Sequence, residues 1–342
     1  MSPVDPDALD KALSAIRTQY GKEIIRTADK YSEPGRIPTG SLELDLITRG
    51  GVPIGRWTHW YGGKFSAKTM ISLKTIANAQ KMGLKCAYYN IEKQLTPKWA
   101  ALHGVDLKNL EVIETTVIEE IGAIMETLMG SVHLHVLDSI PVGVSQDELA
   151  AEVGDWLPGI SARAWGKALR RANNSFSEEN AVIMINHIGT AFGKYAGADE
   201  PKGARLLEYL SSLSVEFRRT SWLFRDKKGN LSDAGEGEQA LDSRDKEPGG
   251  IEFAVRVKKS RVSTPFKTAR MRLDFKTSEI DDLWSLAKAA QIYELATRDS
   301  PKGSWYTMPD ASKVQGSNGI RGYIEEHPEF YDLVIAKIVE DA

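Results

Sequence analysis

The sequence of 342 residues predicts an α/β fold with a central, mostly parallel, twisted sheet, a helical arm at the N-terminus and a small α+β domain at the C-terminus. Three observations predict this arrangement. Short apolar runs alternate with helical repeats through the middle of the chain, later apolar runs follow one another without long helices, and Glu33-Pro34-Gly35 interrupts the chain after the first helix. Apolar strands separated by helices are typical of a parallel sheet covered on both faces.

The first 35 residues are the predicted arm. Pro6 suits the first turn of a helix that Asp5 would cap, and apolar residues then recur at helical spacing: Leu9, Leu13, Ile16 and Tyr20. We expect the core to span residues 36–276 and the C-terminal domain residues 277–342.

The core is expected to alternate strands and helices. The predicted strands span residues 56–61, 85–91, 110–113, 132–137 and 181–185, and the predicted helices span 69–82, 118–129 and 161–176. Three later strands, at 213–218, 253–259 and 269–275, predict an antiparallel extension of the sheet. Residues 224–250 are rich in charge and glycine, which predicts a long exposed loop that is partly disordered.

The composition limits the class of protein. The net charge is −3, so any binding of nucleic acid must come from local basic patches. Cys86 is the only cysteine, which excludes a disulfide framework and a cysteine-based zinc site and fits a reducing compartment. No apolar stretch is long enough for a bilayer, and the N-terminus lacks the pattern of a signal peptide. We therefore expect a soluble, cytoplasmic protein without a membrane partner.

The most informative segment is residues 61–70. Gly62, Lys68 and Thr69 fit the phosphate-loop pattern G-x-x-x-x-G-K-[ST] between a predicted strand and a predicted helix, but Ala67 replaces the second glycine. Loop N–H groups and the helix N-terminus would hold phosphate oxygens, Lys68 would reach the outer phosphates and Thr69 would ligate Mg²⁺. The alternative is an ordinary strand–turn–helix. If position 67 needs a positive φ, alanine costs about 1–2 kcal/mol relative to glycine.

A nucleotide hydrolase also needs an acidic Mg²⁺ partner and a residue that orients water. Asp138 ends an apolar strand, where such a carboxylate belongs, although a helix cap is the common alternative. Glu92 follows another strand at the same predicted sheet edge and could activate water, where the alternative is a solvated loop residue. Trp99 could stack on adenine, although a single tryptophan is more often a core residue.

These motifs and their order resemble the RecA recombinases. The resemblance rests on residues 37–45, the phosphate loop, Glu92 with residues 97–106, Asp138-Ser139 and residues 262–267, and it covers nearly the whole chain. The phage branch, the UvsX-like recombinases, is the most similar. The resemblance implies a RecA-like P-loop NTPase core that uses ATP and Mg²⁺. It also implies a helical filament on single-stranded DNA that pairs this DNA with homologous duplex in recombination and repair, in a bacterial or phage-infected cell.

The resemblance also implies roles for single residues. Glu92 and Lys68 would be catalytic, and Lys259 and Arg261 would reach ATP from the neighbouring protomer. Thr69 would hold Mg²⁺, and Asp138 would do so directly or through water. The implied nucleotide-binding set is Gly62, Gly63, Lys64, Phe65, Ser66, Ala67, Lys68, Thr69, Trp99, Asp138, Asn186 and His187.

Two of these positions depart from the family pattern. His187 replaces a glutamine that senses the γ-phosphate, so this position could respond to pH. Lys64 replaces an acidic residue of the loop.

Two loops, at about 152–160 and 188–205, match the DNA-binding loops of the family. Glycines allow such loops to refold on a ligand, and an aromatic ring that stacks on a base contributes about 1–3 kcal/mol. A solvated basic helix face is the alternative for the arginines. The implied DNA-binding residues are Trp156, Arg163, Arg170, Arg171, Phe192, Lys194 and Arg205.

The implied partners are single-stranded DNA, homologous double-stranded DNA, further copies of this chain through the N-terminal arm, and single-strand-binding and mediator proteins. One alternative is a RecA-fold motor or regulatory ATPase, such as a ring helicase or a circadian-clock-type ATPase. Another is a coating protein of single-stranded DNA with weak ATPase activity. Glu92, Asp138, Lys259 and Arg261 argue against the coating protein, because binding alone needs none of them.

Overall fold

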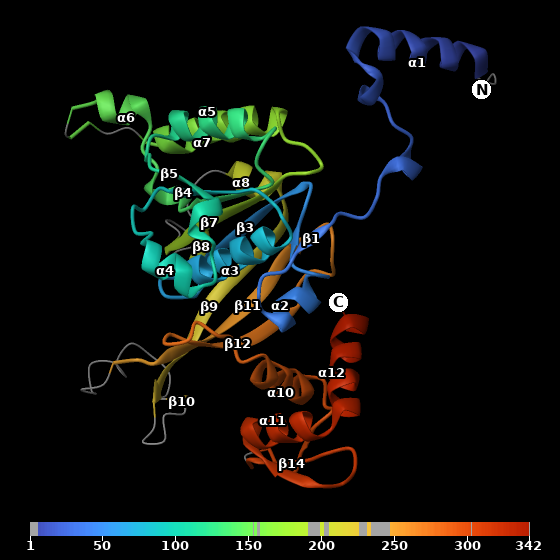
Figure 1. Cartoon of the computed structure of the whole chain (residues 1–342), viewed down its shortest axis with the longest axis vertical. Coiled ribbons are helices and arrows are strands. Elements are labelled where there is room, and N and C mark those ends of the chain that lie inside the picture. Colours follow the sequence, from blue (N-terminus) through green and yellow to red (C-terminus); the bar gives the residue numbers. More distant parts are fainter. Residues whose placement is uncertain are drawn as a thin grey trace. The chain divides into compact units, whose positions relative to one another are not determined.

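The computed structural model describes residues 6–152, 154–155, 158–190, 199–201, 205–225, 231–233, 247–301 and 303–341 (Figure 1). The chain divides into two compact units, residues 1–34 and 35–342. The first unit contains α1 (Pro6–Tyr20) and the short 3-10 helices η1 (Lys22–Ile24) and η2 (Ala28–Lys30). Helix α1 exposes the apolar side chains of Leu9, Ile16 and Tyr20.

The second unit is built on a large sheet with the strand order β12-β11-β9-β3-β7-β6-β4-β5. Every neighbouring pair from β9 to β5 is parallel, whereas β11 and β12 are antiparallel additions beside β9. The predicted α/β class, with a mostly parallel sheet and an antiparallel extension, is therefore confirmed. The strands are β3 (Arg56–Gly62), β4 (Cys86–Asn90), β5 (Leu110–Ile113), β6 (Leu134–Asp138), β7 (Ala181–Thr190), β9 (Ser211–Arg225), β11 (Gly250–Ser260) and β12 (Thr268–Asp274).

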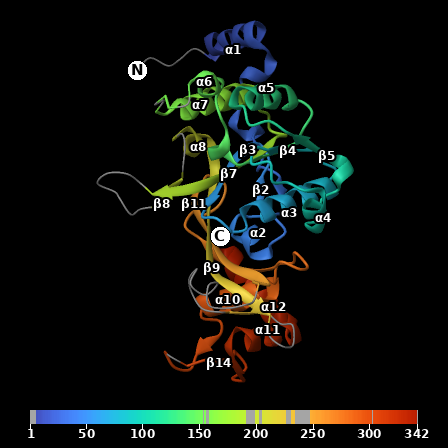
Figure 2. The same ribbon diagram turned by 90° about the vertical axis from the view of Figure 1, so that its left-hand side faces the viewer.

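Helices cover both faces of the parallel part. Alternate residues of β4 belong to two different hydrophobic clusters: Cys86 and Tyr88 lie in the cluster that contains α3, and Ala87 and Tyr89 lie in the cluster that contains α5 and α7. Helices α5 and α7 lie side by side in two views (Figures 1 and 2). The helices of this part are α2 (Leu42–Ile47), α3 (Lys68–Lys81), α4 (Pro97–Leu102), α5 (Ile118–Leu128), α6 (Gln146–Ala150), α7 (Ile160–Asn174) and α8 (Arg205–Leu210), with 3-10 turns η3 (Leu107–Asn109) and η4 (Ile140–Val142).

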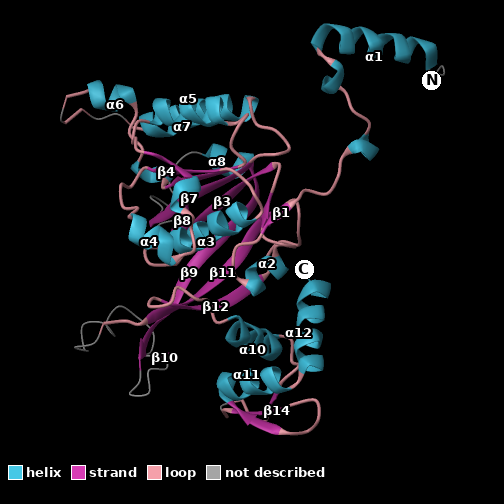
Figure 3. Cartoon of the chain, viewed as in Figure 1, coloured by secondary structure: helices cyan, strands magenta, loops and turns pink. Residues whose placement is uncertain are grey.

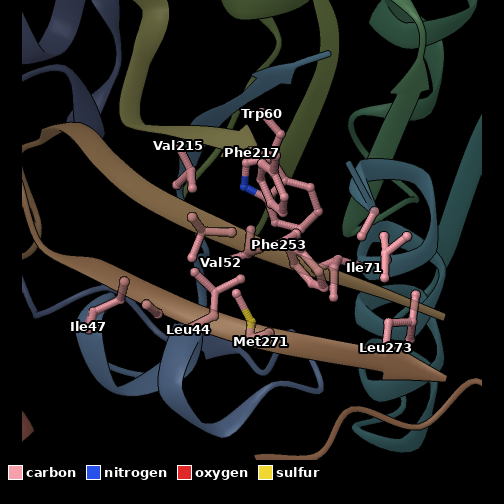
Figure 4. Packing of buried hydrophobic residues seen from close by; sticks show 14 of the residues in the cluster. Leu44, Ile47, Val52, Trp60, Ile71, Val215, Phe217, Phe253, Met271 and Leu273 are labelled. Carbon is pink, nitrogen blue, oxygen red and sulfur yellow. The ribbon is translucent and has the colours of Figure 1, made fainter. Parts of the chain in front are cut away.

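The core around the middle of the sheet is apolar and closely packed. Trp60 of β3 and Phe217 of β9 lie ring against ring, with 5.4 Å between the ring centroids. Figure 4 shows Phe253 of β11 and Met271 of β12 beside them, with Leu44 of α2 facing Met271. The small sheet β1 (Arg36–Ile37) and β2 (Val52–Pro53) leads into this core.

The C-terminal part continues the same hydrophobic cluster. Figure 3 shows β9, β11 and β12 running from the core toward these helices, and α10 contacts β12 while α12 contacts α2. The elements are α10 (Asp282–Ile292), the three-stranded antiparallel sheet of β13 (Thr297–Arg298), β14 (Trp305–Thr307) and β15 (Lys313–Gln315), α11 (Gly316–Glu326) and α12 (Pro328–Asp341).

Two sequence-based expectations need correction. The predicted loop 224–250 is partly strand, because β9 continues to Arg225, β10 (Leu231–Asp233) pairs with it, and β11 already begins at Gly250. Burial of Phe224 and the ion pair of Arg225 with Asp274, at 2.6 Å, favour the longer strand.

The predicted loop 188–205 also begins as an antiparallel strand pair, because β7 runs to Thr190 and pairs with β8 (Asp199–Pro201). Among the described residues, no helix is long and apolar enough to cross a membrane.

Candidate nucleotide site

The phosphate-loop segment joins β3 to α3. Strand β3 ends at Gly62 and helix α3 begins at Lys68. A Cβ atom at Gly62 would lie 2.0 Å from the carbonyl oxygen of Phe217, so the neighbouring strand admits only glycine at this position. The close contact at Gly62 therefore fixes where the loop begins, and the loop leads directly into the N-terminal end of α3.

The loop contains two strained residues. Ala67 has φ 70° and ψ 4°, and Phe65 has φ 54°, so both adopt the left-handed region that favours glycine. The expectation that position 67 needs a positive φ is confirmed, and the cost of alanine there is about 1–2 kcal/mol. The Phe65 ring is largely exposed and rests against Trp222, with 5.8 Å between the ring centroids.

Lys68 is buried at the base of the loop. Its Nζ donates to the carbonyl oxygens of Gly62 and Gly63, at 3.0 and 2.7 Å, and to the hydroxyl of Ser66, at 3.2 Å. Burial lowers the pKa of Lys68 to about 8, while Asp138 and Glu92 act in the opposite direction. A buried lysine whose hydrogen bonds go to neutral oxygens suits an anionic ligand.

Thr69 and Asp138 meet beside this lysine. The Thr69 hydroxyl donates to Oδ2 of Asp138 at 2.7 Å, and the Tyr88 hydroxyl donates to the same oxygen at 2.7 Å. Burial raises the pKa of Asp138, and these two donors oppose that shift. The Asp138–Ser139 peptide bond is cis.

This pair fits Mg²⁺ by the chemistry of its donors. A hydroxyl and a carboxylate are hard oxygen ligands, and Mg²⁺ in nucleotide sites usually takes one or two protein ligands beside phosphates and water. The described residues contain no cluster of three His, Cys, Asp or Glu side chains that could hold a metal without such additional ligands.

Glu92 lies across the site and is held by two donors. His187 Nε2 lies 2.8 Å from its Oε1, and the Ser139 hydroxyl donates to the same oxygen. The hydrogen bond from His187 is the largest cause that lowers the pKa of Glu92. A carboxylate that stays ionised can accept a proton from water.

The loop, α3, the strand ends and α4 enclose a cavity of about 640 Å³. This volume lies in the usual range for small-molecule sites. Trp99 lines it from α4 and packs edge-to-face against His103, with 4.7 Å between the ring centroids. The lining residues are Lys64, Phe65, Ser66, Ala67, Lys68, Thr69, Met70, Tyr88, Asn90, Glu92, Gln94, Leu95, Thr96, Trp99, Asp138 and His187.

Five residues of the predicted site do not line this cavity: Gly62, Gly63, Asn186, Lys259 and Arg261. Asn186 is fully buried, with its side chain 3.1 Å from Nε2 of His59 and bonded to the backbone N–H of His187. Lys259, near the end of β11, donates to the carbonyl oxygen of Glu208, and Arg261 is exposed just beyond that strand. The family resemblance implies that Lys259 and Arg261 instead reach the pocket of a neighbouring protomer.

The candidate DNA residues fall into two groups. Trp156, Phe192 and Lys194 lie outside the described residues. The four arginines are exposed, Arg205 at the start of α8 and the other three on α7. Arg171 pairs with Glu126 of α5 at 2.6 Å, whereas Arg163 and Arg170 are seven residues apart and share a helix face.

Three residues beside these candidate sites were not indicated as site residues by the sequence motifs: Tyr88, Ser139 and Lys167. The hydroxyl of Tyr88 donates to Asp138, and the hydroxyl of Ser139 donates to Glu92. No sequence motif indicates these contacts, because they join residues that are far apart in the sequence. Lys167 is exposed on α7 between Arg163 and Arg170, and its i+4 spacing from Arg163 could have identified it.

This chain is similar to known proteins along nearly its whole length. The family model for the RecA N-terminal domain matches residues 7–279. Protein RecA of Symbiobacterium thermophilum is 33% identical over 355 aligned residues, covering 99% of this chain and 93% of that protein. Protein RecA of Aquifex aeolicus is 33% identical over 348 residues, covering 98% of this chain and 92% of that protein.

Proposed function

This chain belongs to the RecA family of DNA-dependent ATPases of recombination and repair, and we propose that it forms a helical filament on single-stranded DNA and catalyses homologous pairing and strand exchange. Residues 1–35 act as the arm that joins protomers, residues 36–276 as the ATPase core and residues 277–342 as the C-terminal domain. The protein works in the cytoplasm of a bacterial or phage-infected cell, where single-strand-binding and mediator proteins are further partners.

One observation carries the proposal. A single cavity at the carboxyl ends of β3, β4 and β6 brings together Lys68, Thr69, Glu92 and Asp138. Ligands of parallel α/β sheets bind at this edge. A cationic amine, a hydroxyl–carboxylate pair and a separate carboxylate are the groups that phosphoryl transfer to water requires.

Each residue has a role in ATP hydrolysis. The loop N–H groups and Lys68 bind the phosphates, and Trp99 stacks on the adenine. Thr69 and Asp138 would hold Mg²⁺, and the bound ion would supply positive charge to the phosphates. Glu92 orients water and accepts its proton, and His187 and Ser139 fix the direction of that carboxylate.

Two cations complete the site from the neighbouring protomer. Lys259 and Arg261 lie outside the cavity of their own chain, and a cation supplied in trans is worth about 10³–10⁵ in rate in other P-loop enzymes. The exposed apolar side chains of α1 support docking of the arm on a second copy, which would set up this arrangement.

Mixing two inactive variants tests the trans site. A filament of Glu92→Gln and Lys259→Ala/Arg261→Ala protomers in equal amounts joins an intact pocket to intact cations at about one interface in four. Turnover should therefore return to about a quarter of the wild-type rate. Mixtures as inactive as either variant would show that the two cations do not act in the pocket of a neighbouring protomer.

DNA binds across the loops at 152–160 and 188–205 and the basic face of α7. Arg163, Lys167 and Arg170 are exposed on that face and contact phosphates, whereas bases stack on Trp156 and Phe192. Lys194, Arg171 and Arg205 are further phosphate contacts.

A strand-exchange assay tests the function. Circular single-stranded DNA and a homologous linear duplex should give joint molecules in the presence of ATP and Mg²⁺, whereas a heterologous duplex of equal length should give none. Translocation along DNA or duplex unwinding by closed rings would instead favour a RecA-fold motor such as a ring helicase.

A further inference from the structure

We propose that Tyr88 is a positioning residue for Asp138, and that its hydroxyl fixes the oxygen geometry with which this carboxylate takes part in Mg²⁺ binding. The inference rests on the nucleotide site of the proposed function. Tyr88 was not among the residues that the motifs indicated.

The geometry places two donors on one oxygen. The Tyr88 hydroxyl, from β4, and the Thr69 hydroxyl, from α3, both donate to Oδ2 of Asp138, each at 2.7 Å. Tyr88 and Asp138 are 2% and 4% exposed, so the pair is almost fully excluded from water. With both hydrogen bonds on Oδ2, the carboxylate is held in one orientation.

Because Asp138 is buried, the hydrogen bond from Tyr88 contributes strongly to stabilising its carboxylate. An ionised carboxylate in a nearly dry site needs donors, because its charge is poorly solvated there. Mg²⁺ requires near-octahedral oxygen geometry, so a carboxylate that is free to rotate binds it less well.

The position of Tyr88 separates this role from ordinary packing. A phenylalanine would fill nearly the same volume, so the hydroxyl contributes the contact with Asp138 and little to the shape of the core. The ring lines the nucleotide cavity. The adjacent Tyr89 faces the other side of the sheet, in the cluster with α5 and α7.

Tyr89 provides a matched control. Its hydroxyl is also buried and also has a side-chain partner, Nδ1 of His135 at 3.1 Å. Tyr89→Phe therefore removes a buried, bonded hydroxyl from the same strand without touching Asp138.

The experiment measures the binding of a fluorescent ATP analogue to the full chain, without DNA, as Mg²⁺ is titrated and again in excess EDTA. Loss of a hydrogen bond to a charged group should raise the Mg²⁺ concentration for half-maximal binding about tenfold in Tyr88→Phe. Affinity in EDTA should be unchanged. Tyr89→Phe should match the wild type in both conditions, and urea midpoints should show that both variants are folded.

Three results would overturn the inference. A wild-type Mg²⁺ requirement in Tyr88→Phe, or an equal shift in Tyr89→Phe, would reduce Tyr88 to a packing residue and leave the proposed function standing. A wild-type protein that binds no nucleotide at any Mg²⁺ concentration would instead overturn the proposed function, and this inference with it.

Discussion

Strand β3 passes through two regions of opposite character. Trp60 lies in the packed core and is 1% exposed, whereas two residues later Gly62 begins a loop in which Phe65 and Ala67 adopt positive φ. The core is apolar and regular, and the loop is polar and strained. Strained backbone persists only where the surrounding structure enforces it, so the stability of the sheet sustains the strained conformation of this loop.

The largest expected effect is that of Glu92→Gln, which should change turnover and leave the packed core intact. Removal of a general base should reduce ATP turnover about 10²–10⁴-fold, while the protein should still bind DNA in the presence of ATP. Steady-state hydrolysis and DNA binding should be measured on the same preparation. Turnover near the wild-type rate would mean that another residue positions the water.

A substitution in the core should instead lower the unfolding free energy and leave turnover unchanged. Phe253→Ala removes a fully buried ring beside Phe217 and should cost about 3–5 kcal/mol of unfolding free energy. Turnover per folded molecule should remain near the wild-type value under conditions where the variant is folded. Urea unfolding measures the loss, and a cost below about 1 kcal/mol would contradict the packing in Figure 4.

The buried cation of the loop predicts a pH dependence. Free Lys68 has a pKa of about 8, and bound phosphates would raise it, so affinity for ATP is full below that pH and falls as the pH rises above it. The fall should approach tenfold per pH unit between about 8 and the pKa of the complex. Lys68→Arg is the control, because a guanidinium stays charged and its weaker binding should be flat over this range.

The strain itself should be measurable as stability. Ala67→Gly should relieve about 1–2 kcal/mol of left-handed strain and lose part of this gain to greater freedom of the unfolded chain, for a net stabilisation of about 1 kcal/mol. Ala79→Gly, in the regular part of α3, should instead destabilise the protein by about 1 kcal/mol or more. Destabilisation in both variants would show that position 67 is not strained.

The smallest predicted effect lies on a third region, the exposed basic face of α7. Arg170→Ala should reduce the salt dependence of binding to single-stranded DNA, by about 0.7 in the log–log slope for one phosphate contact. Arg171→Ala removes a cation that is already paired with the carboxylate of Glu126, and it should change the slope less. Equal slopes in Arg170→Ala and the wild type would remove Arg170 from the DNA face.

The sequence predicted the parts of the molecule that depend on local pattern. The alternation of apolar strands and helices led to the parallel sheet, and the spacing of Gly62, Lys68 and Thr69 led to the phosphate loop. The positive φ of Ala67 was also predictable, because the pattern assigns a glycine there.

Contacts between distant elements could not be predicted in the same way. The hydroxyl of Tyr88 reaches Asp138 across 50 positions of sequence, and nothing in an apolar strand shows which of two adjacent tyrosines lines the cavity. Charge-rich composition suggested a loop at 224–250, but pairing of β10 with β9 overrides local propensity there.

The most direct test of the account is ATP hydrolysis with and without single-stranded DNA, with electron microscopy of the same samples. We predict turnover that DNA stimulates, together with helical filaments on the DNA. Turnover indifferent to DNA, or closed rings in place of filaments, would contradict the recombinase function.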